Sequence, residues 1–580
     1  MSQFYDSASL VLVPSGYKSQ KIYSQKPLTA DGQLTFSRSS NASRIGPDGL
    51  IQKVHTNELL QSNTFDNVAW SKLTSGTASS PVVTANHTTA PDGTTTAERV
   101  QFLRTGTASG DYSLLTQNYT TSQISTGSIY LKSLTGSAQN VLFYWSIGQG
   151  QVFSIGTDWT RIELPFTSIG LGSFAVGTRG GSGFNAGGDL SIDVAIWGAQ
   201  LETGDIATDY IATTSAAVSV GPVADLPRLS YDPANPTCPS LILEGQRTNL
   251  ALFSEQMDNA SWIKLNGSVT ANAALSPDGY TNADSFIPNT TSGVHALRSN
   301  LFNQSATAAH SWFVKANGYT KVAVRESEQV GNYASFNLST GTLISTNQTG
   351  SIVSYGNGWY RLTLVDTTTL ANCQTSIVVL PDSYTTGDPI INWSGDGVKG
   401  VFAFGAQVEI GAYATSYIGP TLAAATTRGA DSAEKTGISS LIGQTEGTLF
   451  VEFESGPDDA TNHILSLSDG TTSNRVSLVK NTSDDLRAFV ASGGASQASI
   501  LWPNYAPNTN IKAAISYKAN EIKFYANGEN AGTDTSALVP ASLTQVEFET
   551  SGSPFAYPIK QLIVFPTALT ATQLAELTSL

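Results

Sequence analysis

The chain places two acidic side chains where a pair of carboxylates could do chemistry. Glu452 and Glu454 stand two residues apart in an apolar stretch, so an extended strand would turn both to one face. Sandwich enzymes that cleave glycans use two such groups, one as acid and one as nucleophile or base. Here no aspartate stands between Glu452 and Glu454, and no further carboxylate follows Glu454 at a distance of two or three residues. We interpret the pair as a solvated strand face and predict that the chain is not an enzyme.

Metal and nucleophile chemistry have little support in the spacing of histidine and cysteine. These residues are scattered without a local motif: His55, His87, His295, His310, His463, Cys238 and Cys373. Asp189 and Asp396 each stand in a glycine-rich turn, where loop oxygens could hold calcium. One aspartate per turn does not define a site. We therefore predict no cofactor and leave structural calcium as an open alternative.

Aromatic side chains offer a second chemistry, the stacking of sugar rings. Pyranoses present apolar C–H faces to Trp and Tyr, while their hydroxyls need polar partners of fixed geometry. The candidates for a carbohydrate-binding platform are Trp145, Trp393, Trp502 and Tyr505. The three tryptophans have no counterpart elsewhere in the chain, and Tyr505 shares a Pro-rich aromatic loop with Trp502. Internal packing or a subunit contact remains the alternative for each tryptophan.

Two long segments of the chain repeat each other. Trp197–Ile211 carries the phrase GAQLE and a closing Tyr-Ile, and Phe404–Ile418 carries GAQVE and the same ending. Asn57–Trp70 and Asn249–Trp262 match in register at the beginnings of the two segments. Matches at both ends, in one order, predict a duplicated fold.

The duplicated polar residues have two interpretations. Gln200 and Glu202, matched by Gln407 and Glu409, alternate onto one face of a strand. They form either an array for sugar hydroxyls or subunit contacts, or a buried network that ties the sandwich together; we favour the buried network. The repeated tryptophans are interpreted as core anchors: Trp70, Trp262, Trp159 and Trp359.

Composition predicts a large all-β protein. The chain has 580 residues, which corresponds to three or four domains of about 150 residues. Charged residues make up only 13%, and short alternating segments are separated by Gly, Asn, Asp and Pro, the pattern of antiparallel sandwiches. A formal net charge of −15 argues against nucleic acid as a partner. No apolar run approaches the length that membrane insertion needs, and the first residues lack the basic-then-apolar order of a secretory signal, so we expect neither.

These patterns divide the chain into six regions. The predicted fold class is all-β, with tandem antiparallel β-sandwich (jelly-roll) modules and a C-terminal concanavalin-like sandwich. In the last region Asn527-Gly528 predicts a hairpin, and a capping box at Thr570 and Gln573 opens a short helix expected to cover the sandwich. The regions are 1–55, an N-terminal particle-attachment segment; 56–212, sandwich module 1; 213–246, a Pro-rich linker; 247–420, sandwich module 2; 421–446, a linker; and 447–580, the lectin-like sandwich.

Several phrases together resemble a known family. Val13–Lys18, Phe36–Arg44 and Leu243–Leu250, with the GAQ(L/V)E phrases, look like the repeated modules of tailed-bacteriophage tail, fibre or head-fibre proteins. Such proteins contain carbohydrate-binding-like jelly-roll modules. The segment from Gly447 to the end resembles a concanavalin or laminin-G-like lectin sandwich, on strand order and the closing helix.

The resemblance implies a surface-exposed virion component, assembled in the host cytoplasm, that adheres to host surface polysaccharide. Its partners would be other virion proteins and two further copies in a homotrimer, which would also raise avidity. In such a fibre the N-terminus would dock on the particle and the lectin-like unit would be distal. Two alternatives remain: a purely architectural protein that decorates or links virion parts without glycan binding, and a polysaccharide depolymerase using Glu452 or Glu454.

Overall fold

The computed structural model of this chain is almost entirely β, with 51% strand and 3% helix, which confirms the predicted fold class. It describes residues 2–121, 124–326, 331–456, 463–481, 485–503, 505–506, 508–550, 553–555 and 557–580. In these ranges no helix has the length and apolar character needed to cross a membrane. The chain forms two compact units, Val54–Gly221 and a second that joins Met1–Lys53 to Pro222–Leu580.

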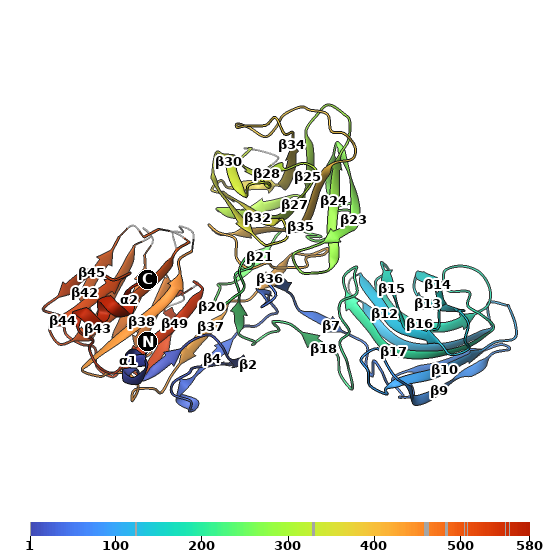
Figure 1. The fold of residues 1–580 in the computed structure, drawn as a ribbon, viewed down its shortest axis with the longest axis horizontal. Helices are drawn as coiled ribbons and strands as arrows, with labels where there is room; N and C mark the ends of the chain where they lie inside the picture. Colours follow the sequence, from blue (N-terminus) through green and yellow to red (C-terminus); the bar gives the residue numbers. More distant parts are fainter. Residues whose placement is uncertain are drawn as a thin grey trace. The chain divides into compact units, whose positions relative to one another are not determined.

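The unit Val54–Gly221 is one sandwich of two five-stranded antiparallel sheets, ordered β15-β12-β17-β10-β9 and β14-β13-β16-β11-β8 (Figure 1). A further pair, β7 with β18, joins the beginning and the end of the unit. The core between the sheets is rich in aromatic rings, among them Trp70, Phe143 and Phe174. The strands are β7 (His55–Asn57), β8 (Ser71–Ser75), β9 (Ser79–Thr88), β10 (Ala97–Leu103), β11 (Tyr112–Thr121), β12 (Ser125–Ser133), β13 (Gln139–Trp145), β14 (Gln149–Ile155), β15 (Thr160–Phe166), β16 (Gly170–Arg179), β17 (Ser191–Thr203) and β18 (Val218–Val220).

Within the other unit, module 2 is a sandwich of two six-stranded sheets, ordered β23-β24-β35-β27-β32-β31 and β22-β25-β34-β28-β29-β30. Two short pairs, β21 with β36 and β26 with β33, accompany it, and Trp262 and Trp312 pack edge to face in its core. The strands are β21 (Arg247–Asn249), β22 (Ile263–Leu265), β23 (Gly267–Leu275), β24 (Thr281–Pro288), β25 (His295–Arg298), β26 (Phe302–Gln304), β27 (Ala308–Asn317), β28 (Lys321–Glu326), β29 (Tyr333–Asn337), β30 (Thr342–Thr346), β31 (Thr349–Ser354), β32 (Trp359–Asp366), β33 (Leu370–Cys373), β34 (Thr375–Leu380), β35 (Gly400–Ile410) and β36 (Thr426–Arg428).

The two modules share one strand order, as the repeated phrases predict. Strand β17 lies between β12 and β10, and β35 lies in the same way between β27 and β24. Both GAQ phrases contain a β-bulge at the glycine, where Gly198 has φ +64° and Gly405 has φ +60°. A bulge puts one extra residue into a strand and needs a residue that tolerates positive φ. The glycine of the phrase is therefore a requirement of the sheet.

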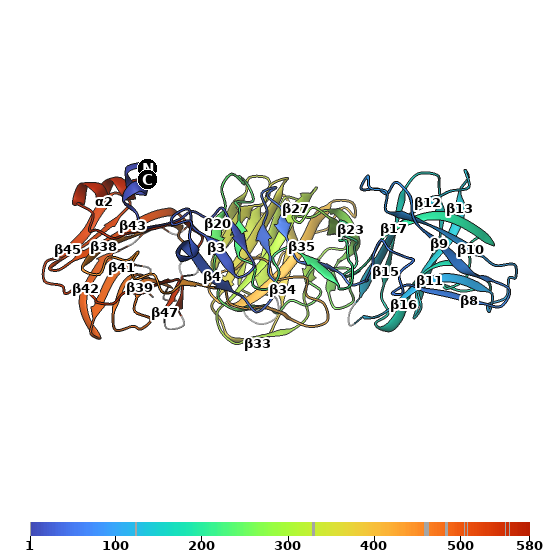
Figure 2. The ribbon, with the colours of Figure 1, turned by 90° about the horizontal axis from the view of Figure 1, so that it is seen from below.

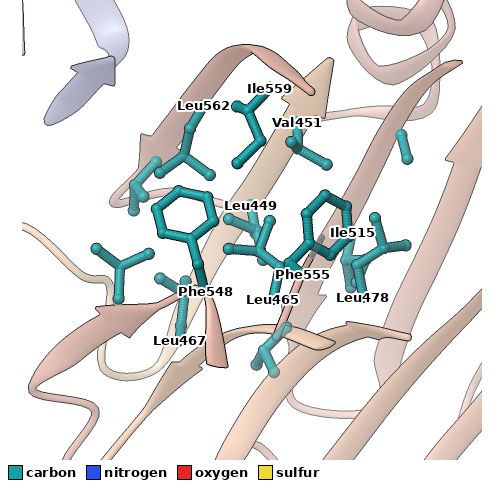
Figure 3. Packing of buried hydrophobic residues seen from close by; sticks show 14 of the residues in the cluster. Leu449, Val451, Leu465, Leu467, Leu478, Ile515, Phe548, Phe555, Ile559 and Leu562 are labelled. Atoms are coloured by element: carbon teal, nitrogen blue, oxygen red, sulfur yellow. The ribbon is translucent and has the colours of Figure 1, made fainter. Parts of the chain in front are cut away.

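The C-terminal sandwich packs a sheet ordered β19-β20-β49-β38-β43-β44-β45 on one ordered β2-β3-β4-β37-β46-β39-β40-β41-β42. Figure 3 shows Leu449, Ile515, Phe548 and Phe555 filling the space between them. A turn at Asn527-Gly528, with φ of 48° and 83°, joins β44 to β45 as predicted. The strands are β37 (Ser432–Lys435), β38 (Glu446–Glu454), β39 (His463–Ser468), β40 (Arg475–Lys480), β41 (Leu486–Ser492), β42 (Ala495–Trp502), β43 (Asn510–Lys518), β44 (Glu521–Ala526), β45 (Glu529–Asp534), β46 (Gln545–Glu547), β47 (Glu549–Thr550), β48 (Ser553–Pro554) and β49 (Ile559–Phe565).

Residues from the predicted attachment segment and the Pro-rich linker complete this sandwich. Strand β1 pairs with β49, β4 pairs with β37, and β20 pairs with β49. The N-terminal segment thus packs on the C-terminal module through these strands, and its Ile51 joins an apolar cluster with Phe313 and Tyr417 of module 2. The added elements are β1 (Leu10–Leu12), β2 (Tyr17–Lys18), β3 (Lys21–Tyr23), the 3-10 turn η1 (Ala30–Gly32), β4 (Gln33–Ser37), β19 (Arg228–Ser230) and β20 (Ser240–Ile242), while β5 (Arg44–Ile45) pairs with β6 (Ile51–Gln52) nearby.

Two short helices, α1 (Ser2–Ser7) and α2 (Ala571–Thr578), pack in one apolar cluster on the outer side of this sandwich (Figure 2). Phe4 meets Phe565 at 6.4 Å between ring centroids, and Leu574 is fully buried. The capping box of Thr570 and Gln573 is present, which confirms the predicted helix. The expectation that the N-terminus and the lectin-like unit lie at opposite ends of a fibre is wrong within the chain, because both belong to one sandwich.

Candidate functional site

The duplicated Gln and Glu side chains form a buried network in module 2. Gln407 donates from Nε2 to Oε2 of Glu409 at 2.6 Å, and its Oε1 accepts the backbone N–H of Ile418 at 2.6 Å. Glu409 also accepts the backbone N–H of Thr415 at 2.9 Å and bonds its hydroxyl. Asn249 completes the network by donating to the carbonyls of Ala406 and Ile418, both at 3.0 Å. The GAQ strand is thus tied both to the loop that follows it and to the beginning of the module.

Module 1 repeats this network bond for bond. Gln200 donates to Glu202 at 2.6 Å and accepts from the N–H of Ile211 at 2.6 Å, while Glu202 accepts the N–H of Thr208 at 2.9 Å. Asn57 donates to the carbonyl of Ile211 at 2.8 Å. Every polar atom in these sets is used by the protein itself, so the preferred interpretation, a buried tether, is confirmed.

Trp145, the first predicted platform residue, lies inside module 1. Its side chain is 0% exposed and stacks on Phe166 with 5.3 Å between centroids. Gly172 approaches the ring so closely that an added Cβ would lie 2.4 Å from Cε2. No face of this ring is open to a sugar, and its position corresponds to the packing alternative.

Trp393 lies at the rim of the module 2 core. Its ring contacts His295 at 4.7 Å and Tyr319 at 5.0 Å, both edge to face. The indole Nε1–H is buried without a hydrogen-bond partner, and the backbone carbonyl accepts from His295. The side chain is half-buried, so part of the ring remains accessible.

Trp502 and Tyr505 stack on each other at the end of β42. Their ring centroids lie 6.4 Å apart with an interplanar angle of 11°. Tyr505 is buried in the sandwich core, whereas Trp502 is half-buried and packs against that core. The structure therefore brings these two predicted residues together. Trp145 lies in module 1, Trp393 in module 2, and the Trp502–Tyr505 pair in the C-terminal sandwich.

Glu452 and Glu454 lie on one outward face of β38. Glu452 accepts a hydrogen bond from Asn510 at 2.9 Å, and Glu454 lies 3.7 Å from Nζ of Lys560, which in turn donates to Asn510 at 3.1 Å. These contacts join side chains of neighbouring strands on the surface of the sheet. Both carboxylates therefore remain accessible to water.

The two aspartates considered for calcium serve as turn acceptors. Asp189 accepts the N–H of Asn140 at 2.8 Å, and Asp396 accepts the N–H groups of Val398 at 2.9 Å and Lys399 at 2.8 Å. These backbone hydrogen bonds lower the pKa of the Asp396 carboxyl. In the described part of the chain, no three His, Cys, Asp or Glu side chains gather as a metal-binding group.

A cavity of about 230 Å³ brings together residues that the sequence patterns did not select. Its walls come from the β5–β6 region, from the segment between β19 and β20, and from module 2. Three tyrosines line it, Tyr231, Tyr355 and Tyr417, and two arginines, Arg44 and Arg361. Tyr417 is buried and bonded to Ser254 at 3.0 Å, whereas Tyr231 and Tyr355 are half-buried. Aromatic faces and polar groups therefore meet in one small space.

The two arginines of the cavity are fixed by neutral partners. Arg361 donates to the carbonyl of Thr415 at 2.6 Å and to Ser311 at 3.0 Å, and its guanidinium lies 5.3 Å from the Phe313 ring. Only 8% of Arg361 is exposed, and its Nε–H has no partner. Arg44 donates to Gln52 at 3.0 Å and to the hydroxyl of Tyr17. Among the described residues, neither arginine forms an ion pair.

Glu244, the acidic residue in the lining, is already neutralised. It lies 2.8 Å from Arg228 and 2.9 Å from Arg428, and it accepts from the backbone and hydroxyl of Ser416 at 2.7 and 2.6 Å. Burial alone would raise the pKa of Glu244, but Arg428 and Arg228 outweigh burial and hold that pKa well below its usual range. Glu244 is therefore ionised and fully engaged by protein groups.

Sequence reasoning missed this cavity because its walls are far apart in the chain. One signal was available in the comparison of the two copies. Arg161 of module 1 lies 3.8 Å from Glu163, but the residue at the matching place after Arg361 is Thr363. The second copy thus keeps the arginine and lacks its acid.

No family model matches this chain, and no curated protein matches it. Among solved structures it is similar to the CBM40 of the Ruminococcus gnavus IT-sialidase bound to α2,3-sialyllactose, with 18% identity, 24% of this chain and 86% of that chain covered, and a TM-score of 0.22. It is also similar to domain 4 of AbnA, a GH43 arabinanase from Geobacillus stearothermophilus, with 14% identity, 26% and 73% covered, and a TM-score of 0.22. The tandem CBM22-1–CBM22-2 of Paenibacillus barcinonensis Xyn10C matches with 10% identity, 61% and 96% covered, and a TM-score of 0.19. Likenesses at these TM-scores carry no information on what this chain binds.

Proposed function

We propose that this chain is a structural protein of a tailed-bacteriophage virion, part of a tail or head fibre, that adheres to host surface polysaccharide. Support for carbohydrate binding comes from the cavity, where the half-buried rings of Tyr231 and Tyr355 stand beside guanidinium groups and hydroxyls. Sugars are bound by this combination of apolar faces and fixed hydrogen-bond partners. Support for a virion role comes from the repeated phrases of the sequence.

The carbohydrate-binding proposal is tested on a glycan array with the full chain. The array holds polysaccharides from bacterial surfaces, and binding to at least one of them is expected. Tyr355→Ala should reduce that binding at least tenfold, because it removes a stacking face from the cavity. Phe184→Ala, which removes an exposed ring in module 1, serves as the matched control. A chain that binds none of the polysaccharides would exclude adhesion to them.

The virion proposal is tested by imaging. An antibody against residues 447–580 should label phage particles, and the label should lie at the head or at the tail. Sedimentation of the purified chain should give the mass of a homotrimer if the fibre follows the expected assembly. Virions without label would contradict the proposed location.

A purely architectural protein is the second candidate, and the duplicated networks favour it. Gln200, Glu202, Gln407 and Glu409 all serve internal bonds, so the most strongly repeated residues of the chain hold its own fold. An architectural role predicts virions that incorporate the chain, together with no binding on the array. A depolymerase would release reducing ends from host polysaccharide and lose that activity in Glu452→Gln or Glu454→Gln.

A further inference from the structure

We infer that the cavity lined by Tyr231, Tyr355, Arg44 and Arg361 binds one acidic sugar residue, a pyranose that carries a carboxylate. The inference rests on the proposed carbohydrate binding and adds the class of sugar. It follows from the charges around the cavity, its size, and the chemistry of its free groups.

The positive charges near the cavity exceed the negative ones. Arg38, Arg228 and Arg428 form one connected cluster with two carboxylates, Glu244 and Asp431. That cluster has three cations for two anions. Glu409 adds a third carboxylate, since it accepts from the backbone and hydroxyl of Thr415 in the cavity wall. Arg44 and Arg361 add two cations without carboxylate partners in the described residues, so five guanidinium groups stand against three acids. The excess occurs in a chain whose formal net charge is −15.

A set of three charged residues next to Tyr417 has a net negative charge and lowers this positive excess without cancelling it. Lys53 is paired there with Glu255 at 2.7 Å and with Asp278 at 2.7 Å. Burial raises the pKa of Glu255, and the nearby Asp278 adds to that rise although Lys53 opposes it. Even with both carboxylates ionised, this trio contributes a single negative charge. Counted over these groups, five arginines and Lys53 stand against five carboxylates, so a small net positive charge remains around the cavity.

Buried cations without counter-charges are costly, and an anionic ligand would remove that cost. A guanidinium offers paired N–H donors that match the two oxygens of a carboxylate. Arg361 has an unpartnered Nε–H and is only 8% exposed, so its rotamer is already fixed by Thr415 and Ser311. Little side-chain entropy would be lost when such a group takes a ligand.

The remaining groups suit a sugar ring better than a bare anion. The hydroxyls of Tyr231 and Tyr355 have no partner within the described part of the chain, and both rings are partly accessible. A volume of about 230 Å³ lies below the roughly 300–1,000 Å³ of sites for drug-sized ligands, which points to one sugar unit of a longer chain.

The test measures binding of sodium glucuronate, methyl glucoside and sodium acetate to the full chain by ligand-detected NMR and calorimetry. We expect glucuronate to bind at least tenfold more tightly than either of the other two. Its affinity should fall as salt is raised, since the interaction is between charges. Arg361→Gln should remove the preference for the acid, and Arg161→Gln, the matched arginine of module 1, should leave it unchanged.

Because Arg361 also bonds the loop that carries Thr415, its replacement could disturb the fold. Arg44→Gln supplies an independent variant at a half-buried position, and a loss of threefold or more in glucuronate affinity, with an unchanged melting temperature, is expected. Equal binding of glucuronate and methyl glucoside, equal binding of acetate, or glucuronate binding that ignores both variants would each overturn the inference. Array binding to neutral polysaccharides alone would overturn it while leaving the proposed function intact; no array binding at all would remove both.

Discussion

Gln407 and Glu409 stand two residues apart on β35 and hydrogen-bond to each other at 2.6 Å inside a side-chain network without solvent exposure. Each carboxylate oxygen of Glu409 receives a donor from the protein, and the amide of Gln407 spans the gap to Ile418. Such a network specifies how the loop after the strand returns to the sandwich.

Replacing the carboxylate by an amide should therefore be costly. Glu409→Gln keeps the shape but sets an NH2 donor against the donors of Thr415 and Gln407. Leaving buried donors unpaired costs about 1–3 kcal/mol, so the unfolding transition of module 2 should move to lower temperature by several degrees. Differential scanning calorimetry of the full chain checks this. The matched Glu202→Gln should shift the transition of module 1 instead, and exposed Glu434→Gln should shift neither.

The bulge glycines give a second prediction. A Cβ at Gly405 would lie 2.9 Å from the Phe313 ring, and the residue has φ +60°. Gly405→Ala should destabilise module 2 by about 1–3 kcal/mol through backbone strain and crowding. Gly156→Ala is the control, because a Cβ there meets nothing within 4 Å. Urea unfolding measures the effect. If Gly405→Ala is as stable as the wild-type chain in that measurement, the role given to the bulge glycine is contradicted.

The duplication, the fold class and the closing helix could be predicted from the sequence because each depends on local patterns. Alternation gives strands, Asn527-Gly528 gives a hairpin, and Thr570 with Gln573 gives a helix start. The pairing of β1 with β49 could not be predicted, since it joins residues more than five hundred positions apart and a three-residue strand has no periodicity to read.

The candidate site could not be predicted from the sequence for a related reason. Tryptophans without a counterpart were chosen for stacking, but burial is decided by neighbours, and Trp145 has Phe166 and Gly172 against its ring. The cavity instead combines Arg44 and Tyr231, from segments interpreted as attachment region and linker, with tyrosines and an arginine of module 2. The sequence shows one sign of the cavity. Arg161 is followed two residues later by Glu163, whereas the residue at the matching place after Arg361 is Thr363.

Two acids at equivalent positions should make both modules sensitive to pH. Glu98 pairs with Ile196 in the sheet as Asp284 pairs with Ala403. Burial raises the pKa of Glu98 to about 7, with a further rise from Asp66. Burial likewise raises the pKa of Asp284 to about 7. Both carboxyls thus hold a proton in the folded state at a pH where the unfolded chain has lost it.

The direction in which stability changes with pH follows from this difference in proton binding. A group whose pKa is raised by folding contributes stability that is complete below its unfolded pKa, near 4, and is lost as pH rises through about 7. These two groups should therefore make each module less stable at pH 7.5 than at pH 5.5. Glu98→Gln should flatten the dependence in module 1, and Asp284→Asn should do so in module 2. Melting curves across this range that keep their slope in both variants would contradict the assignment.

Asp431 holds the N-terminal segment and the stretch after Pro222 to the C-terminal sandwich, and its loss should be the most damaging of these changes. One oxygen lies 3.0 Å from Arg38 and the other bonds Arg228, with every side chain fully buried. Asp431→Asn would leave two buried cations with Glu244 as the remaining acid of the cluster. Removing one partner of a buried ion pair costs about 3–5 kcal/mol.

The expected result is a C-terminal sandwich that melts far below that of the wild-type chain and exposes β1–β4 to proteolysis first. Glu454→Gln provides the control in the same sandwich, because Glu454 pairs with Lys560 where their side chains are 49% and 38% exposed. Exposed pairs contribute about 0–1 kcal/mol. Equal effects of the two substitutions in calorimetry would mean that the buried cluster does not hold the N-terminal strands in place.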